Sequence, residues 1–584
     1  MSDTVSNAAD PAWPHMTLDE AREKLTAPGM MFETEEVRIS GNLTTVWKNL
    51  PPTFADFARF VVGAHGDKEF IVFEDERITY DAWFKASVAL ARNLRKMGVA
   101  KGDRVALAAQ NLPEWPVIYF AGLAIGAIMV PLNAWWTGPE LEYGLADSGT
   151  KMLIADAQRY DRIKPHLGNL PGIGHCVVTR AMAELDEGTI SLDSLIGPSG
   201  TWADLPDQDF PETDLMPDDD GSILYTSGTT GKPKGAIATH RNSLTNILSS
   251  AYTLARGALR RGEAPKESTP LTGLLVIPLF HVTGCTALMG PAIAGGSKLV
   301  MMRKWDVTEA LGIIERERVQ LAGGVPTIAW QILEHPDRDK YDLSSLESIS
   351  YGGAPAAPEL VRKIKSEFGA SPAMGWGMTE TSGTVTAHSA EDYLNRPDSC
   401  GPPVPVAKLK IMSEDGTREL PAGEIGELWA FGAMVVRGYW NNPEANAETF
   451  IDGWIRTGDL AKLDDEGFCY ICDRAKDMVI RGGENIYSSE VENVLYDHPA
   501  VTDAALIGIP HKTLGEEPAA VVHLAPGTHA SEAELQAWVS ERIAKFKTPV
   551  KIVFVEETLP RNANGKILKK DLARLYFGVE DAAA

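Results

Sequence analysis

The segment from Tyr225 to Gly235, YTSGTTGKPKG, is the feature that most limits how this chain can fold and what it can bind. Its eleven residues include three glycines, two lysines and four small hydroxyl side chains, and none is acidic. Glycine lets the backbone approach anionic oxygens and turn successive N–H groups toward them, an arrangement that binds phosphate. Further donors and charge come from the side chains of Thr226, Ser227, Thr229, Thr230, Lys232 and Lys234. The segment therefore predicts a loop that binds polyphosphate.

The loop differs from the Walker A loop of nucleotide hydrolases. A Walker A loop has a glycine five residues before its Gly-Lys pair and Ser or Thr after the pair. Thr226 and Pro233 stand at those two positions here. A flexible surface turn is the plain alternative, but it would leave the run of hydroxyls without a role.

Length, charge and cysteine content narrow the class of protein. A chain of 584 residues exceeds what one hydrophobic core usually supports, so at least two domains are expected. A net charge of -25 argues against nucleic acid as a partner, because phosphate backbones need clustered Lys and Arg. Five cysteines in so long a chain do not make a disulfide framework, which favours a reducing compartment.

The amino terminus, MSDTVSNAADPAW, carries no basic region and no apolar core, so neither a secretory signal nor a transit peptide is expected and the predicted location is the cytoplasm. The uncharged stretches Trp115–Gly138 and Leu274–Ser297 are long enough to suggest membrane spans. Glycine and proline interrupt both, which instead favours buried helices and strands of an α/β core.

Helix and strand patterns alternate along the chain. The range 80–97 has apolar residues at helical spacing and stops at Gly98, Arg104–Ala108 reads as a buried strand, and the pattern recurs at Lys151–Asp156. This alternation predicts an α/β fold with layered, largely parallel sheets. Near the other end, Ser531 and Glu534 form a capping box. The apolar side chains that follow predict an amphipathic helix of a small α+β unit: Leu535, Trp538, Val539, Ile543 and Phe546.

Cys469 and Cys472 form a CxxC pair in the strand-like run GFCYICDR. Residues three apart on a strand face opposite sides, and no second pair or nearby His completes a zinc set. Structural cysteines are therefore expected.

Several further blocks follow the phosphate loop in a fixed order. They are PLFHVTG (278–284), YGGAP (351–355), GWGMTET (375–381), GELW (from 426), RGYW (from 437), GWIRTGDL (453–460), DRAKDMVIRGGENIYSSEVE (473–492) and NGK (564–566). With these blocks, the chain from about Thr79 to Leu572 resembles the adenylate-forming superfamily, which contains acyl- and aryl-CoA synthetases, adenylation domains of peptide synthetases and luciferase. The resemblance implies three parts: a partly disordered lead over residues 1–45, a large N-terminal adenylation domain over 46–475, and a small mobile α+β C-terminal domain over 476–584.

The superfamily joins a carboxylic acid to the α-phosphate of ATP and then passes the acyl group to a thiol. The resemblance implies that Lys566 is the catalytic lysine, which bridges carboxylate and phosphate. It also implies that Glu380 and Thr226 hold Mg²⁺, since this ion prefers hard oxygen ligands and phosphates. A solvated surface lysine is the alternative for Lys566 in the run KILKK.

The resemblance further assigns the ATP site. Asp459 would accept hydrogen bonds from the ribose, Arg474 would assist at ribose or phosphate, and Trp376 would lie beside adenine where many relatives have Tyr. The remaining positions implied for ATP are Thr226, Ser227, Gly228, Thr229, Thr230, Gly231, Lys234, Gly353, Ala354, Pro355, Gly375, Gly377, Met378, Thr379 and Lys566.

Lys476 matches the hinge at which the small domain of the superfamily turns between half-reactions. After that turn, Arg481, Gly482 and Gly483 would line the tunnel for the pantetheine arm of coenzyme A. A plain β-turn is the alternative for the two glycines.

The acyl pocket is implied around His281, whose role is open between a gate, a contact to the carboxylate and a plain wall. Its other expected members are Val282, Gly284, Gly352, Met378 and Gly383. The range 274–297 has no Asp or Glu to hold a substrate ammonium, which argues against an amino acid. The expected function is an acid:CoA ligase acting on a medium- or long-chain fatty acid, and a long-chain acid would allow transient contact with a membrane surface. Aryl or alicyclic acids, luciferase-type oxidation and a non-catalytic binding protein are the alternatives.

Overall fold

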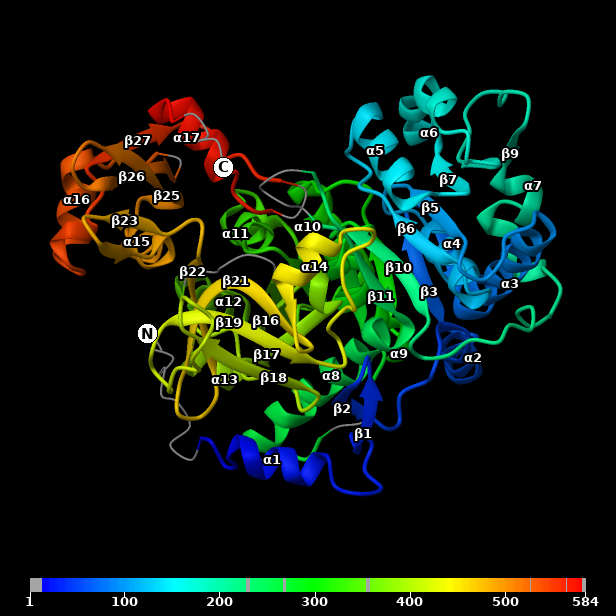
Figure 1. Cartoon of the computed structure of the whole chain (residues 1–584), viewed down its shortest axis with the longest axis horizontal. Coiled ribbons are helices and arrows are strands. Elements are labelled where there is room, and N and C mark those ends of the chain that lie inside the picture. The colour runs from blue at the N-terminus through cyan, green and yellow to red at the C-terminus, as the bar shows by residue number, and fades with distance from the viewer. Residues whose placement is uncertain are drawn as a thin grey trace.

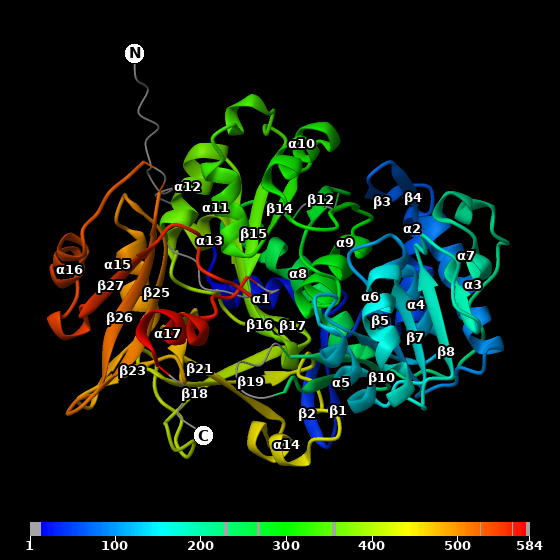
Figure 2. The same cartoon turned by 90° about the horizontal axis from the view of Figure 1, so that it is seen from above.

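The computed structural model describes residues 13–226, 232–265, 269–352, 358–525, 527–562 and 565–579. Two large sheets with helices around them and a third, smaller sheet form most of the molecule, and a separate small sheet lies at one end (Figure 1). Seen from above, the eight-stranded sheet lies between the seven-stranded sheet and this small C-terminal unit (Figure 2). The predicted α/β architecture is thus confirmed.

The first large sheet has seven strands in the order β11-β10-β6-β5-β7-β8-β9. All neighbours are parallel except β10 and β11, which form an antiparallel pair on either side of the phosphate loop. The strands are β5 (Arg104–Ala108), β6 (Ile128–Pro131), β7 (Met152–Asp156), β8 (His175–Thr179), β9 (Thr189–Ser191), β10 (Asp220–Tyr225) and β11 (Gly235–Thr239). The strand predicted at 104–108 is confirmed.

The second large sheet has eight strands in the order β17-β16-β15-β14-β12-β13-β3-β4. Its central strands are parallel, and the pairs β3–β4 and β16–β17 at its edges are antiparallel. The strands are β3 (Glu69–Phe73), β4 (Glu76–Thr79), β12 (Thr272–Leu275), β13 (Lys298–Met301), β14 (Leu321–Gly324), β15 (Ser348–Gly352), β16 (Ser371–Met378) and β17 (Gly383–Ser389).

Helices cover the faces of these sheets, and one core holds side chains from both. Trp83 of α3 and Phe120 of α4 pack in it with Ile71 of β3 and Leu107 of β5. The helices are α2 (Phe54–His65), α3 (Tyr80–Lys96), α4 (Glu114–Ala124), α5 (Gly138–Ser148), α6 (Ala157–Ile163), α7 (Leu192–Ile196), α8 (His240–Arg260), α9 (Gly290–Ala294), α10 (Val307–Glu317), α11 (Pro326–Glu334), α12 (Pro358–Phe368) and α13 (Ala390–Asn395). Short 3₁₀ helices are η1 (Lys164–Asn169), η2 (Ser199–Asp204), η4 (Arg338–Lys340), η5 (Thr379–Thr381) and η6 (Lys545–Lys547), and η3 (Thr283–Met289) is a π-helix.

The stretch Trp115–Gly138 contains α4, which is buried throughout, and then β6. None of the helices in the described ranges combines the length and the apolar character that crossing a bilayer requires.

The third sheet of the large domain is antiparallel, which the alternating pattern did not predict. Its strands are β18 (Ala407–Met412), β19 (Gly426–Gly432), β20 (Phe450–Ile451), β21 (Trp454–Leu463) and β22 (Cys469–Arg474), with α14 (Pro443–Thr449) beside them. Cys469 and Cys472 lie on β22, and Cys469 is buried in the core of this sheet.

The C-terminal unit is a sheet of β23 (Val479–Arg481), β24 (Glu484–Ile486), β25 (Val501–His511), β26 (Gly515–Leu524) and β27 (Lys551–Val555) with helices α15 (Ser488–Tyr496), α16 (Glu532–Ser540) and α17 (Lys569–Phe577). The capping box of Ser531 and Glu534 is present at α16. The prediction that this helix reaches Phe546 is wrong. It ends at Ser540, and Ile543 and Phe546 pack on the same core from the segment that follows.

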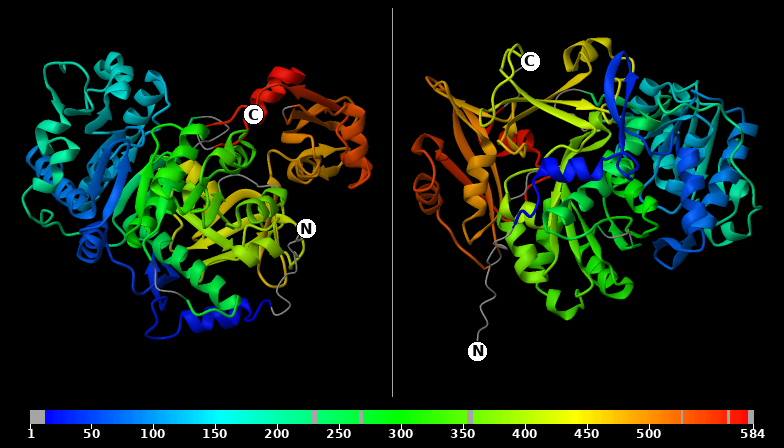
Figure 3. Two further views of the ribbon diagram at one scale, coloured as in Figure 1. Left: turned by 180° about the vertical axis from the view of Figure 1, so that it is seen from behind. Right: turned by 90° about the horizontal axis from the view of Figure 1, so that it is seen from below.

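The described part of the amino-terminal segment packs on the large domain. It forms α1 (Leu18–Leu25) and a hairpin of β1 (Thr34–Ile39) and β2 (Asn42–Trp47). Ala21 and Leu25 are buried together with Tyr252 of α8. In Figure 3, α1 lies along the outside of the large domain, far from the small C-terminal sheet.

Candidate active site

The two ends of the predicted phosphate loop are held together as a hairpin. Tyr225 pairs with Gly235 across β10 and β11. The Thr226 amide donates to the Lys234 carbonyl at 2.8 Å, and the Lys234 amide donates to the Thr226 hydroxyl at 3.2 Å. Tyr143 of α5 donates its hydroxyl to the Pro233 carbonyl at 2.9 Å. The remaining loop residues of the prediction lie outside the described residues: Ser227, Gly228, Thr229, Thr230 and Gly231.

Glu380 lies on η5, directly after β16, and is only 7% exposed. Tyr439 donates its hydroxyl to Oε1 of Glu380 at 2.6 Å, and the Lys234 ammonium lies 5.0 Å from the centre of the Tyr439 ring. Burial raises the pKa of Glu380, while the bond from Tyr439 and the charges of Arg474 and Lys234 lower it. The structure therefore brings Glu380 to the Lys234 end of the phosphate loop.

Asp459 on β21 receives hydrogen bonds from two other elements. Trp376 of β16 donates its indole N–H to Oδ2 at 2.9 Å, and Arg474 of β22 lies 2.5 Å from Oδ1 through Nε. The Asp459 side chain is nearly inaccessible, at 2% exposure of the residue. Burial raises the pKa of this carboxyl, and Arg474 and Trp376 oppose that shift.

Lys566 reaches this cluster from the small domain. Burial lowers the pKa of its ammonium, Arg474 lowers it further, and Asp477 and Asp459 raise it. Its Nζ lies 3.9 Å from Oδ2 of Asp477, and its amide donates to the Asn562 side chain at 3.0 Å. Lysine, arginine and two carboxylates thus surround one site, although they lie up to about a hundred residues apart in the chain.

Gly565 brings the Lys566 loop against the large domain. Its φ is +73°, a left-handed conformation that favours glycine. A Cβ at this position would lie 2.6 Å from Cγ2 of Val325, at the end of β14. Both the conformation and the close approach therefore require glycine before Lys566.

The predicted hinge and coenzyme A residues lie at the start of the small domain. Lys476 is in a turn in which the Asp477 and Met478 amides donate to the Arg474 carbonyl at 3.0 and 3.2 Å. Gly482 and Gly483, with φ of +61° and +88°, form the two-residue turn between β23 and β24. Arg481 pairs with Glu517 at 3.1 Å in the same domain. The turn accounts for both glycines, and their contact with coenzyme A stays a prediction.

His281 lies in a loop that Asn111 holds in place. The Asn111 side chain donates to the Ile277 carbonyl at 3.1 Å and accepts from the Leu279 amide at 2.9 Å. Burial lowers the pKa of His281 to about 4, so the ring is neutral near pH 7, and its Nδ1 accepts from the Thr283 amide at 3.3 Å. A neutral imidazole, with no charged partner among the residues that the structure describes, fits a wall or a hydrogen-bonding group better than a cation for the carboxylate.

The predicted acyl-pocket glycines permit close backbone contacts. A Cβ on Gly284 would lie 2.3 Å from the Pro278 carbonyl oxygen, and one on Gly383 would lie 2.6 Å from Oδ1 of Asn246. Asn246 in turn donates to the Ser382 carbonyl at 2.7 Å, which joins α8 to the start of β17.

Most of the other predicted residues are on neighbouring strands. Gly352 pairs with Gly375, Gly377 and Met378 end β16, Thr379 begins η5, and Val282 is buried before η3. Gly353, Ala354 and Pro355 lie outside the described residues.

Tyr439 and Val325 are residues that sequence reasoning missed. The RGYW block contains Tyr439, but a motif does not say which carboxylate a tyrosine will bond. Val325 has no motif signal, because its contact with Gly565 arises only when the two domains meet.

Comparisons with known proteins agree with this geometry. Residues 58–440 match the family described as AMP-binding enzyme, and residues 490–566 match the AMP-binding enzyme C-terminal domain. A feruloyl-CoA synthase from Amycolatopsis sp is 35% identical over 499 residues, which cover 85% of this chain and 94% of that protein. A long-chain-fatty-acid–CoA ligase from Bacillus subtilis (strain 168) is 35% identical over 535 residues, covering 87% and 91%.

Among solved structures, the anthranilate CoA ligase AuaEII in complex with anthranoyl-AMP superimposes with a TM-score of 0.80 and 27% identity, over 91% of this chain and 99% of that one. The family matches span most of the chain, and the relatives are matched over nearly their full length. The chain therefore belongs to the AMP-binding enzyme family, as an AMP-forming acid–thiol ligase of the acyl-CoA synthetase branch of the adenylate-forming superfamily.

Proposed function

We propose that this ligase first joins a carboxylic acid to the α-phosphate of ATP, with Lys566 as the catalytic cation, and then transfers the acyl group to coenzyme A. The observation that carries the proposal is that the loop of Lys566 lies against Val325 of the large domain, where the charges of Arg474 and Asp459 act on the Lys566 ammonium. A catalytically silent binding protein would have no need of this grouping of charges.

In the first half-reaction a carboxylate oxygen attacks the α-phosphorus and pyrophosphate leaves. Negative charge builds up on the phosphate oxygens, so cations held in place in a buried site stabilise the transition state most. Lys566 and Arg474 supply positive charge at the acyl and ribose side, and Lys234 supplies it at the phosphate loop. No base is needed, since the carboxylic acid is already ionised near pH 7.

We assign the magnesium site to Glu380 and the hydroxyl of Thr226, together with the phosphates of ATP. A buried carboxylate and a hydroxyl next to a phosphate loop are hard oxygen donors of the kind Mg²⁺ prefers. Among the described residues no group of three or more acidic, His or Cys side chains offers a protein-only metal cage. When bound, the ion would neutralise phosphate charge.

In the second half-reaction Lys566 has to leave, because it occupies the space that a thiol must enter. We propose that the small domain, residues 476–584, turns at Lys476. The contacts that hold the domain in its present orientation include the Gly565 contact with Val325, a hydrogen bond from the Ser488 amide to Asp473, and an ion pair of 3.7 Å between Arg362 and Asp497. Both partners of that pair are about half exposed, so it contributes little to the free energy of docking.

Tyr439 gives a test of the magnesium site. Tyr439→Phe removes the hydroxyl that bonds Glu380 and so raises the pKa of this buried carboxyl further. An acid with a raised pKa is neutral up to a higher pH, so the acid limb of the adenylation rate should move to higher pH. The Mg²⁺ concentration for half-maximal pyrophosphate release should rise about tenfold, as is typical when a partner of a metal ligand is lost.

Tyr143→Phe is the matched control, because it removes a tyrosine hydroxyl that bonds the phosphate loop at Pro233 and does not reach Glu380. It should leave the Mg²⁺ dependence and the acid limb unchanged. Equal effects of the two variants would show that Tyr439 acts on the loop in general and not on the metal carboxylate.

For the acid, we propose a medium- or long-chain fatty acid. Buried apolar side chains lie before and after His281 in the chain, including Val276, Ile277 and Val282, and the neutral His281 adds no charge. The fatty-acid ligase relative supports this choice. An aryl acid is the second candidate, supported by the feruloyl-CoA synthase and the anthranilate ligase.

We propose the cytoplasm as the location, in keeping with five free cysteines.

A chain-length series decides between the two acids. Each buried CH₂ contributes about 0.8 kcal/mol, so kcat/KM should rise about three- to fourfold per carbon until an apolar tunnel is full. Pyrophosphate release would be measured for straight-chain acids of about four to eighteen carbons beside benzoate- and cinnamate-like acids. A flat profile with an aromatic acid ahead by about tenfold would reject the fatty-acid assignment and support the aryl one.

A further inference from the structure

A groove whose lining shares no residue with the Lys566 cluster has no role in the chemistry above. Its volume is about 550 Å³, which suits a small organic molecule. It lies between α1, α8 and the turns that follow β18 and β21. Its walls are formed by Leu18, Asp19, Arg22, Tyr252, Arg256, Pro402, Pro403, Ile411, Glu419, Leu420, Pro421, Ala422, Leu463, Asp464, Asp465, Glu466 and Gly467.

Arg256 is a buried cation in the wall of this groove. It is only 2% exposed, it donates one hydrogen bond, to the Ala387 carbonyl at 2.5 Å, and its guanidinium lies 5.8 Å from the Tyr252 ring centre. Its buried Nε has no hydrogen-bond partner among the described residues. A buried guanidinium with an N–H that no described residue bonds is costly, so this side chain favours an anion.

The nearest buried carboxylate does not supply that anion. Asp392 is bonded to Arg260, one helical turn along α8, at 2.8 Å. The ion pair of Asp392 is with Arg260, so a positive charge remains at the Arg256 end of the groove.

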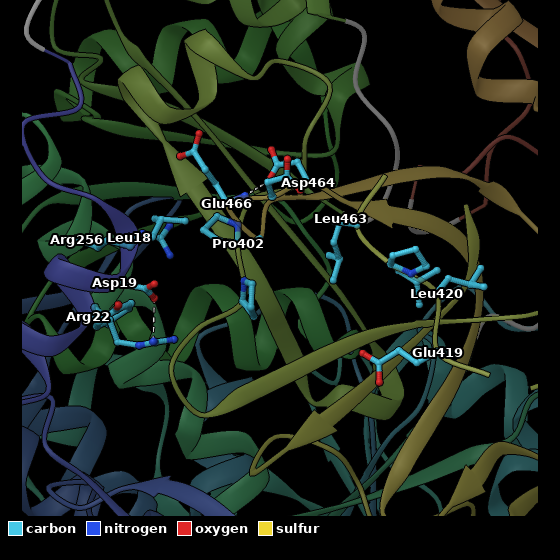
Figure 4. Close-up of a pocket in the computed structure, with 17 residues that line it drawn as sticks. Leu18, Asp19, Arg22, Arg256, Pro402, Glu419, Leu420, Leu463, Asp464 and Glu466 are labelled. Atoms are coloured by element: carbon cyan, nitrogen blue, oxygen red, sulfur yellow. Dashed lines mark hydrogen bonds and ion pairs between the residues drawn. The ribbon is translucent and has the colours of Figure 1, made fainter. Parts of the chain in front are cut away.

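The opposite end of the groove is negative. Figure 4 shows Arg256 beside Leu18 at one side and Glu419 with Leu420 at the other. Asp464 and Glu466 are paired with Arg396, whereas Glu419 and Asp465 have no ion-pair partner in the described ranges. Between the ends lie the apolar surfaces of Pro402 and Leu463 (Figure 4). Carboxylates at the rim repel polyanions such as nucleotides.

From this arrangement we infer that the groove is a binding site for a small zwitterion whose carboxylate and ammonium are separated by an apolar spacer. The carboxylate binds at Arg256, the spacer lies along Pro402 and Leu463, and the ammonium lies at Glu419. This site is independent of the proposed function, since none of its lining residues belongs to the Lys566 cluster.

The test compares three probes of one length by calorimetry: 8-aminooctanoate, octanoate and octylamine. Charge-assisted contacts at both ends should make 8-aminooctanoate bind about tenfold more tightly than either single-ended probe. ATP and inorganic phosphate should not compete with it. Equal binding of 8-aminooctanoate and octanoate, or competition by phosphate, would overturn the zwitterion assignment.

Variants assign the binding to the groove, because octanoate also resembles a substrate. Arg256→Met should weaken 8-aminooctanoate binding about tenfold, whereas Arg256→Lys keeps the charge and should weaken it less. Glu419→Gln should abolish the preference for 8-aminooctanoate over octanoate. Ala422→Trp, on an exposed position, should block the groove without touching the buried arginine, so it tests the site even if Arg256→Met fails to fold. Unchanged binding in Ala422→Trp and Glu419→Gln would refute the proposal.

Discussion

Lys566→Ala should lower the rate of acyl-adenylate formation by about 10² to 10³, the usual loss for one preorganised donor in a buried site. Transfer of the acyl group from supplied acyl-adenylate to coenzyme A should continue near the wild-type rate. The reason is positional: in the proposed mechanism Lys566 acts only while the small domain is docked as seen here, and it moves away before the thiol enters. Pyrophosphate release and thioester formation, measured separately, report the two steps.

Lys512→Ala provides the matched control, since Lys512 is an exposed lysine of the same domain. It should change neither half-reaction. A parallel loss of both half-reactions in Lys566→Ala would mean that this lysine supports the fold or the domain arrangement as a whole, and the catalytic assignment would be abandoned. The lowered pKa of Lys566 adds a pH signature. Its ammonium loses its proton at a lower pH than that of a free lysine. As the pH rises, the adenylation rate should therefore begin to fall at a lower pH than an ordinary lysine would give.

Lys476→Pro should impair the second half-reaction and spare the first, which is the reverse of the effect expected for Lys566→Ala. Proline fixes φ at one value, so a rotation that changes the backbone at residue 476 is blocked. Steady-state formation of acyl-CoA should fall by about tenfold or more, because a domain movement becomes limiting, while pyrophosphate release in a single turnover persists.

Lys476→Ala removes the side chain but leaves the backbone free, and it should keep most of the acyl-CoA output. Single-turnover pyrophosphate release in the proline variant also shows that the protein has folded with Lys566 in place. Normal steady-state output from Lys476→Pro would refute rotation at this residue.

The sequence predicted the parallel part of the fold better than the antiparallel part. Buried strands such as Arg104–Ala108 are continuous apolar runs next to helical patterns, and these signals are local. Apart from the strand-like run at Cys469–Arg474, the third sheet escaped prediction, because its strands are half-buried and only one short helix, α14, lies between them in the chain. The end of α16 was misplaced for a related reason. Ile543 and Phe546 continue the helical spacing, but the core accepts them equally well from the segment after Ser540.

The sequence could predict which residues form the candidate site, but not how their side chains bond to one another in space. Motifs pointed to Lys566, Asp459 and Glu380, but not to the indole bond between Trp376 and Asp459 or to the hydroxyl that Tyr439 gives to Glu380. Such bonds join residues about sixty to eighty positions apart, and no local pattern encodes them. The groove beside Arg256 could not be predicted either, because it forms only where α1 packs near α8.

The contact between Gly565 and Val325 joins the loop of the proposed catalytic lysine to the apolar cluster beside the proposed acyl pocket. Val325 packs in one cluster with Val276 and Ile277, which precede His281 in the chain. It also contacts Gly565, the residue directly before Lys566. A smaller side chain at Val325, introduced to enlarge the proposed acyl pocket, would also remove the surface against which the Lys566 loop packs. Selection for new acids at this position should therefore favour second substitutions in the small domain, far from any atom of the substrate.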